Sequence, residues 1–487
     1  MRTGRWRDGA MMVALVVLGG GLALRFGEHI GINEGQGWDG LAYTQWARDT
    51  WHAVGEGLTR YHAQRVLPSA IVDGALRAAT VTHDIPHVVR AFAMLDVAAL
   101  AVAAALWANL AAVMAWSRAA AWAGFVALFL SFANAKHAIY YPTLTDPSAF
   151  ALGMAMVWAY LTGRPFALWL SAALGMVTWP ALPPLAVILL VFPRPTHAPI
   201  ALPASRLERR LAISASIAAA GGFVAVALYY LLHPLPGVGD EKFAAWVPRG
   251  LLWLTLPALV AVIAGGLYRV LSPVRLPAIA AYGRGLARRR LAVAALAVVV
   301  LHLAGECYLS CVGTRGSGPT GAQFACEHTL AALRGPLWGL VHHVVYFGPI
   351  IALALVMWRR VSEVAWSWGP AAVIALAMVV MFAAGSNSRQ WNHLVPFLVA
   401  ATIAATAPWW TLHRVLGFAA VAFVWSKVWF HLGYDTALDW HAFPNQRYFM
   451  NTGPYAADAP YAVHLAAAAL TIAGAWLATR RLRTSQS

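Results

Sequence analysis

Residues 88–115 read VVRAFAMLDVAALAVAAALWANLAAVMA, and this stretch decides the fold class. Only Arg90 and Asp96 carry charge in it, and it exceeds the about 20 residues that a helix needs to cross a bilayer. Backbone groups in hydrocarbon must be satisfied within their own segment, which favours a helix. The sequence therefore predicts a membrane-spanning helix here.

The rest of the chain has the same character. Of its 487 residues, 60% are hydrophobic and 11% are charged, and the mean hydropathy is +0.63. A soluble domain carries roughly 25% charged residues. This composition excludes a soluble enzyme, a disordered chain and a disulfide scaffold.

Hydropathy predicts an all-α polytopic protein that forms a single integral membrane domain over residues 1–487, with 12 to 14 crossings. The pair 166–178 and 182–193 is short and proline-rich, so whether it crosses fully stays open. The other candidate spans are 11–24, 88–115, 119–135, 147–163, 211–233, 249–268, 291–305, 336–357, 365–385, 394–409, 413–431 and 461–479.

Charge sets the orientation. The segments predicted to lie inside hold 21 of the 35 Lys and Arg residues but only three of the 19 acids, which is the positive-inside pattern. The net charge of +16 is therefore spread over short cytoplasmic loops, and no basic face indicates nucleic-acid binding. Both termini should be cytoplasmic, and the larger or unusual outside segments are 25–87, 136–146, 306–335 and 431–460.

The first outside loop contains GWDGLAYTQWARD, residues 37–49. Two stretches, 41–54 and 63–79, are amphipathic and should form helices along the membrane surface. Asp39 precedes the first of them, where the helix dipole keeps a carboxylate ionised. A plain N-cap role for Asp39 is the alternative.

Two further outside motifs carry charge among apolar residues. YHAQRVLPSAIVDG, residues 61–74, holds Arg65, which either snorkels to the membrane surface or binds a phosphate. NAKHAIYYPTLTDPSAF, residues 134–150, holds Lys136 and Asp146. Asp146 before Pro147 is typical of a helix N-cap, and a cap can also present its carboxylate to a cavity.

Together these motifs resemble the GT-C superfamily of polytopic glycosyltransferases, which use polyprenyl-phosphate sugars. The resemblance covers about the first 150 residues: D-G-x-x-Y-x-x-x-A from Asp39, Y-x-x-Q-R-x-L-P from Tyr61, and T-D-P at Asp146. The chain departs from many relatives at Thr178-Trp179-Pro180, where they have a basic residue. It also has Gly40 where some carry a second carboxylate, which Glu34 or Asp146 would have to supply.

The resemblance implies an inverting enzyme of the bacterial cytoplasmic membrane, active on its extracytoplasmic side in cell-envelope glycan biosynthesis. Its partners would be the membrane, a polyprenyl-phosphate sugar and an acceptor glycan, lipid or protein. The implied catalytic residues are Asp39 and Asp146. Arg65, Lys136 and Arg389 would bind the donor phosphate. The candidates for substrate binding are Glu34, Tyr43, Tyr61, Gln64, His137, Tyr141 and His393.

Other readings stay open. An O-antigen polymerase or ligase would place its main loop late, as 431–460 allows. A lipid-linked sugar transporter or flippase would need more polar spans, and an acyltransferase would need a buried histidine such as His302, His342 or His343. No histidine motif indicates a metal, although a divalent ion stays an alternative. Cys307, Cys311 and Cys326 allow one disulfide or three free thiols.

Overall fold

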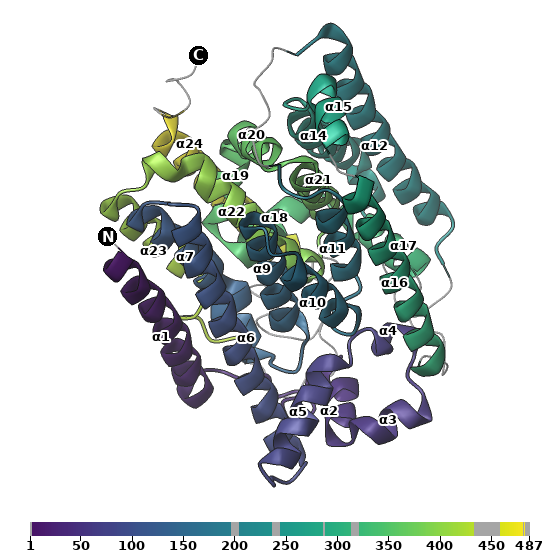
Figure 1. The fold of residues 1–487 in the computed structure, drawn as a ribbon, viewed down its shortest axis with the longest axis vertical. Coiled ribbons are helices and arrows are strands. Elements are labelled where there is room, and N and C mark those ends of the chain that lie inside the picture. The colour runs from purple at the N-terminus through teal and green to yellow at the C-terminus, as the bar shows by residue number, and fades with distance from the viewer. Residues whose placement is uncertain are drawn as a thin grey trace. The chain divides into compact units, whose positions relative to one another are not determined.

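The computed structural model describes residues 2–195, 204–235, 244–285, 288–312, 321–432, 458–480 and 482. Every regular element in these ranges is a helix, which confirms the all-α prediction (Figure 1). The chain divides into two compact units, each built from three stretches of sequence.

The first unit comprises residues 1–191, 292–318 and 410–446. Helix α6 is its centre and packs against α1, α5 and α9 (Figure 1). The helices of this unit are α1 (Arg2–Phe26), α2 (Gly40–Arg48), α3 (Thr50–Glu56), α4 (Arg60–Ala63), α5 (Leu67–Ala78), α6 (Ile85–Val113), α7 (Arg118–Phe129), η1 (Phe132–His137), α8 (Ala138–Tyr140), α9 (Asp146–Thr162), α10 (Pro165–Met176), α11 (Leu182–Val191), most of α16 (Arg288–Val312) and α23 (Leu412–Ser426).

The second unit comprises residues 192–291, 319–409 and 447–487. Helix α14 packs against α12 and α21, and α24 packs against α18 and α19. The helices of this unit are α12 (Arg206–Leu232), η2 (Arg249–Leu251), α14 (Leu252–Leu271), α15 (Leu276–Gly285), α17 (Gly321–Ala332), α18 (Trp338–Phe347), α19 (Pro349–Val356), α20 (Trp358–Trp368), α21 (Pro370–Ala384), η3 (Ser388–Leu394), α22 (Val395–Thr406), η4 (Ala407–Trp409) and α24 (Asp458–Ala478).

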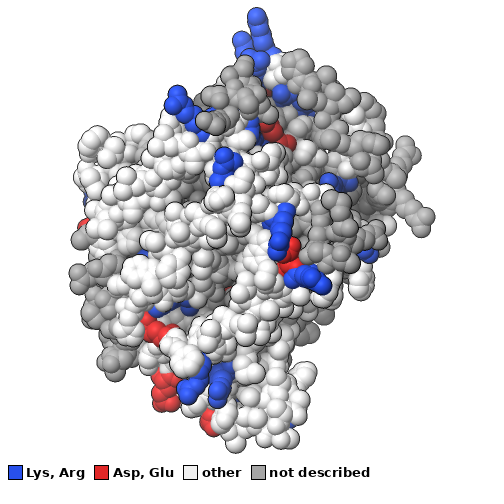
Figure 2. All heavy atoms as spheres, turned by 90° about the vertical axis from the view of Figure 1, so that its left-hand side faces the viewer, with Lys and Arg blue, Asp and Glu red and all other residues white. Residues whose placement is uncertain are grey.

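Five described helices are long and apolar enough to span a membrane, and a bent pair would make six. Five shorter apolar segments of 10–17 residues add to them. Charged side chains are also sparse over much of the face in Figure 2. The chain is thus a polytopic membrane protein, and the count of 12 to 14 crossings stays a prediction that depends on the shorter helices.

Two predicted spans are broken rather than straight. The segment 119–135 becomes α7 followed by η1, a short π-helix, with a bend of 56° at the break. The segment 336–357 is interrupted at Gly348, whose φ of +79° favours glycine, and Pro349 then opens α19. Hydropathy averages over such breaks, which explains why the sequence predicted continuous helices.

The predicted surface segments 41–54 and 63–79 are helical. The first is split at Asp49, whose side chain accepts a hydrogen bond from the N–H of His52 and so caps α3. Helix α5 buries Val72 and Leu76 on one face and exposes Ile71 on the other. The first loop therefore folds as short amphipathic helices docked on α6.

The predicted outside loops 306–335 and 431–460 differ in how much of them the structure describes. Residues 306–312 continue α16 as a helix and residues 321–332 form α17, so much of 306–335 is helical rather than loop. Most of 431–460 lies outside the described residues.

Candidate active site in the first unit

The turn before α2 is docked on the second outside motif. The hydroxyl of Tyr141 accepts a hydrogen bond of 2.7 Å from the N–H of Trp38. Thr143 donates to the carbonyl oxygen of Gln36 at 2.9 Å. Gly40 lies so close that an added Cβ would be 2.0 Å from Thr143 Oγ1. The two motifs named in the sequence are thus in contact, and together they fix the position of Asp39.

Asp39 is exposed and immediately precedes α2. Its backbone is already helical (φ −61°, ψ −32°) and its side chain makes no capping hydrogen bond. Asp39 thus holds the N-cap position of α2 without capping the helix through its side chain. An exposed carboxylate held at a fixed position could accept a proton from a bound hydroxyl group.

Asp146 is buried and is the first residue of α9, so Thr145 holds the N-cap position, one residue earlier than predicted. Asp96, on α6, is also buried, and its Oδ2 atom has no hydrogen-bond partner among the described residues. Asp96 and Asp146 interact electrostatically, so these two buried carboxyl groups lie near each other.

Arg65 is the most unusual residue of the first unit. Its side chain is buried, with 8% exposed, and its Nε atom has no hydrogen-bond partner in the part of the chain that the structure describes. Its Cζ lies 4.2 Å from the ring centroid of Tyr61 and 4.4 Å from that of Trp179. Burial of a cation without an ion pair is costly, and cation–π contacts repay only part of that cost.

Electrostatics connects Arg65 to the predicted carboxylates. Burial acts to lower the pKa of Arg65, but nearby groups outweigh it and the pKa is raised above its ordinary value. Those groups, in order of influence, are Tyr61, Tyr43, Asp39 and Asp146. Arg65 is therefore firmly cationic, and both predicted catalytic carboxylates lie within its electrostatic reach.

His62 also belongs to this site. Burial lowers its pKa, the charge of Arg65 lowers it further, and Asp39 acts in the opposite direction. The imidazole is therefore neutral at neutral pH. The ring of His62 lies 4.8 Å from Trp46 and 5.2 Å from Tyr61, centroid to centroid.

These contacts form one continuous series, which we call the aromatic column; its neighbouring rings meet edge to face. It runs from Trp179 through Arg65, Tyr61, His62 and Trp46 to Tyr43, with 5.5 Å between the last two rings. The column joins α2, α4 and the turn between α10 and α11, and thereby places a cation beside the Asp39 turn.

Lys136 is in a different situation. Its Nζ atom makes an ion pair of 2.9 Å with Glu28 and donates to the carbonyl oxygen of Phe430 at 2.6 Å. Both side chains of the pair are buried. The charge of Lys136 is thus already balanced, and it ties the chain before α2 to the segment after α23.

The remaining candidates of the first unit have varied surroundings. Glu34 is exposed in a turn with a φ of +57°. Gln64 is half-buried and ends α4. His137 is buried and lies 6.2 Å from the ring of Tyr141. Of the substrate-binding candidates, Tyr43 and Tyr61 are in the aromatic column, and Tyr141 holds the Asp39 turn.

Arg389 and His393 belong to the second unit, on η3. Arg389 is half-buried and His393 is buried against Phe382. The grouping of Arg389 with Arg65 stays a prediction.

The histidines considered for an acyltransferase differ in burial. His302 is exposed, whereas His342 and His343 are buried on α18. Both ring nitrogens of His343 are engaged: Nδ1 with Ser388 at 2.8 Å, and Nε2 with the carbonyl oxygens of Ala383 and Gly385 at 3.0 Å. These bonds hold α18, the end of α21 and η3 together, which is a structural role for His343.

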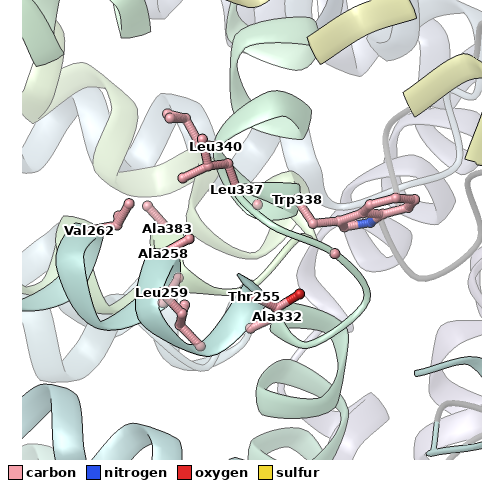
Figure 3. Close-up of a pocket in the computed structure, with 12 residues that line it drawn as sticks. Thr255, Ala258, Leu259, Val262, Ala332, Leu337, Trp338, Leu340 and Ala383 are labelled. Atoms are coloured by element: carbon pink, nitrogen blue, oxygen red, sulfur yellow. The ribbon is translucent and has the colours of Figure 1, made fainter. Parts of the chain in front are cut away.

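A small pocket in the second unit is apolar. It lies between α14, the start of α18 and the end of α21 (Figure 3). Thr255, Leu259 and Leu340 are among its 12 lining residues, none of which is charged. This pocket therefore offers nothing that would bind a phosphate.

Metal and disulfide chemistry find little support in the described ranges. No group of three or more His, Cys, Asp or Glu residues there could hold a metal ion. Cys307 and Cys311 are exposed on α16, Cys326 is buried on α17, and all three are free thiols.

Sequence reasoning missed Trp179 and His62. A signal for Trp179 existed, because Trp179-Pro180 stands at the apex of the proline-rich pair 166–178 and 182–193. His62 stands inside the quoted Y-x-x-Q-R motif. Their contacts with Arg65 could not be read from the sequence, because Trp179 is remote from Arg65 along the chain.

No family model matches the chain, and no curated protein or solved structure matches it either.

Proposed function

We propose that this protein is a GT-C-type glycosyltransferase that moves a sugar from a polyprenyl-phosphate donor to an extracytoplasmic acceptor. The observation that carries the proposal is Arg65, a buried cation that forms no salt bridge among the described residues and lies within electrostatic reach of Asp39. A phosphate beside Arg65 would supply the missing counter-charge, and charge-assisted bonds to phosphate are strong.

Asp39 and Arg65 have complementary roles in the proposed reaction. The acceptor oxygen attacks the anomeric carbon, and the bond from that carbon to the phosphate oxygen breaks. Asp39 takes the acceptor proton, while polyprenyl phosphate departs and Arg65 balances its negative charge. A single displacement inverts the anomeric configuration.

The membrane setting fits this chemistry. A polyprenyl tail requires an apolar environment, which the spanning helices and lipid provide together, whereas burying its phosphate in hydrocarbon is costly. The surface helices α2–α5 carry Asp39, Tyr61 and Arg65, which would keep the reacting groups near headgroup level.

The decisive experiment measures sugar transfer by the purified protein in lipid nanodiscs. The donors are radiolabelled undecaprenyl- and decaprenyl-phosphate hexoses and pentoses, supplied with extracted envelope glycans and lipids as acceptors. Asp39→Asn should reduce turnover by about 10²–10⁴-fold, the usual contribution of a general base. Glu56→Gln, which changes an exposed carboxylate on α3, should leave the rate unchanged.

Each alternative has its own outcome in this assay. Turnover that is unchanged in Asp39→Asn would remove Asp39 from the base role. Movement of intact donor between leaflets without sugar transfer would favour a lipid-linked sugar transporter. Activity only on diphosphate-linked oligosaccharides would favour a polymerase or ligase.

A further inference from the structure

The turn between α10 and α11 lies directly against the Arg65 segment. The N–H of Leu67 donates to the carbonyl oxygen of Val177 at 2.9 Å, so the backbones on either side of the site are joined. Helices α10 and α11 also approach each other closely, because a Cβ added to Gly175 would lie 2.7 Å from that of Leu182. The two helices and their turn form a compact hairpin, here called the α10–α11 hairpin.

The backbone of Trp179 is fixed at the apex of this hairpin. Its N–H donates to Gly175 at 2.9 Å, and its carbonyl oxygen accepts from Leu182 at 3.1 Å. The preceding Thr178 is buried, and its hydroxyl donates to Leu174 at 2.7 Å. With 5% of Trp179 exposed, the indole ring has little freedom to leave Arg65.

Arg65 needs such support because no salt bridge to a described residue fixes its guanidinium. An arginine side chain has many rotamers, and a carboxylate usually selects one of them. Its Cζ atom instead lies 4.2 Å and 4.4 Å from the centroids of the Tyr61 and Trp179 rings. Cation–π contacts do not use the guanidinium N–H groups as hydrogen-bond donors to oxygen, so these groups can still bind an anion.

We propose that Trp179 is a positioning residue for the donor phosphate, and that the α10–α11 hairpin is a wall of the phosphate site. Trp179 acts through Arg65: it holds the guanidinium plane so that the N–H fork faces the phosphate. This inference rests on the proposed function and adds to it a residue outside the two outside-loop motifs.

The test measures binding of a sugar-free lipid phosphate, so it does not depend on the chemical step. Wild type, Trp179→Phe, Trp179→Leu and the matched control Trp107→Leu are compared in nanodiscs. Trp107 is also buried, on α6, outside the aromatic column. The probe is fluorescent decaprenyl phosphate, and decaprenol without phosphate reports tail binding alone.

We expect Trp179→Leu to weaken decaprenyl phosphate binding about tenfold, the scale of a desolvated cation–π contact. Trp179→Phe should stay within about threefold of wild type because a π face is kept. Decaprenol binding and the Trp107→Leu control should change little. In an Arg65→Ala background, Trp179→Leu should cause no further loss, because its effect passes through Arg65.

Two results would overturn the inference. One is wild-type affinity in Trp179→Leu, and the other is an equal loss in the presence and absence of Arg65, which would mean a merely structural role. In both cases the wild type still binds lipid phosphate, so the proposed function survives. A wild type that does not bind decaprenyl phosphate would overturn the inference and the proposed function together.

Discussion

Arg65 and Lys136 show how two buried cations from similar motifs acquire different roles. Lys136 has Glu28 at 2.9 Å and so contributes a closed ion pair. Arg65 has aromatic rings around it and no salt bridge to a described residue, which leaves its charge for a ligand to balance. Both residues were expected to bind the donor phosphate, and their surroundings favour Arg65.

Arg65→Lys should therefore be a damaging change although it keeps the charge. Lysine is a point charge that cannot present a planar fork or lie flat over two rings. We expect the donor KM to rise about tenfold, as the loss of about 1.4 kcal/mol would produce, and more in Arg65→Ala. The measurement is initial rate against donor concentration. Full activity and unchanged donor KM in Arg65→Lys would move the phosphate site elsewhere.

Sequence could identify these residues singly but not their pairing. Asp39 stood out because it precedes a predicted surface helix, and Arg65 because it stands among apolar residues. The aromatic column depends on a contact between Arg65 and Trp179, and local spacing carries no information about such distant pairs. Likewise, nothing in the sequence distinguished Lys136, which has a carboxylate partner, from Arg65, which has no salt bridge to any described residue.

At the scale of elements, the Asp39 turn depends on the absence of a side chain at Gly40. Gly40→Ala would put a Cβ 2.0 Å from Thr143 Oγ1, so the turn must move away from the second outside motif. We expect turnover to fall at least tenfold, since about 1 Å of misplacement can cost 10²-fold. The measurement is kcat in the nanodisc assay.

The control for this change is Gly55→Ala on neighbouring α3. A Cβ there would meet nothing within 4 Å, so activity should be unchanged. Equal activity in Gly40→Ala and Gly55→Ala would mean that the docking of the two motifs does not matter for the reaction.

A second element-scale prediction concerns Asp73 on α5. Its Oδ1 atom is bound by Arg77 at 2.6 Å and by His83 at 3.1 Å, and Oδ2 accepts from the N–H of Thr50 at 3.0 Å. Burial acts to raise the pKa of Asp73, but the hydrogen bonds from Arg77 and Thr50 outweigh it and the pKa is lowered. The carboxylate thus joins α5 to α3 in its ionised form.

Because the pKa of Asp73 is lowered in the folded protein, its contribution to stability is present above the unfolded value of about 3.9. It is lost as pH falls through the lower folded value. Asp73→Ala should destabilise the protein by about 1–3 kcal/mol, the cost of leaving the buried N–H of Thr50 unsatisfied. The difference from wild type in thermal unfolding should be constant from pH 5 to 8 and shrink below pH 4. A difference that grows on acidification would contradict this assignment.

Element prediction succeeded where apolar length decided the outcome. The predicted spans 88–115 and 461–479 correspond to α6 and α24, each to within three residues at either end. It failed where a local backbone feature overrides hydropathy, as at Gly348 and in the π-helix η1. It also missed α20, because Arg359 and Arg360 looked like a loop but lie on the first turn of an amphipathic helix.

At the scale of the whole molecule, the path of the α10–α11 hairpin through the membrane decides how the chain is threaded. Its helices have 12 and 10 residues, about 18 Å and 15 Å at 1.5 Å per residue, which is shorter than the roughly 30 Å hydrocarbon core. Yet Trp179 at its apex contacts Arg65, which the charge pattern assigns to the outside. On that assignment we predict that the hairpin reaches the outer side, although its helices alone are too short.

Thiol labelling in intact cells tests this path. In a variant without native cysteines, single cysteines replace Gly55 in the first loop, Ala181 beside the apex, and Arg118 and Ser205 in predicted inside loops. A membrane-impermeant maleimide should label positions 55 and 181 and spare 118 and 205 until the cells are opened. Arg164 and Arg194 flank the hairpin, and cysteines there should also be protected, because flanking residues must complete both crossings.

Labelling at 55 without labelling at 181 in either state would mean that the apex is closed off within the membrane. Protection of position 55 would invert the whole orientation, and the Asp39 site would then face nucleotide-containing cytoplasm, where a lipid-borne donor has no advantage.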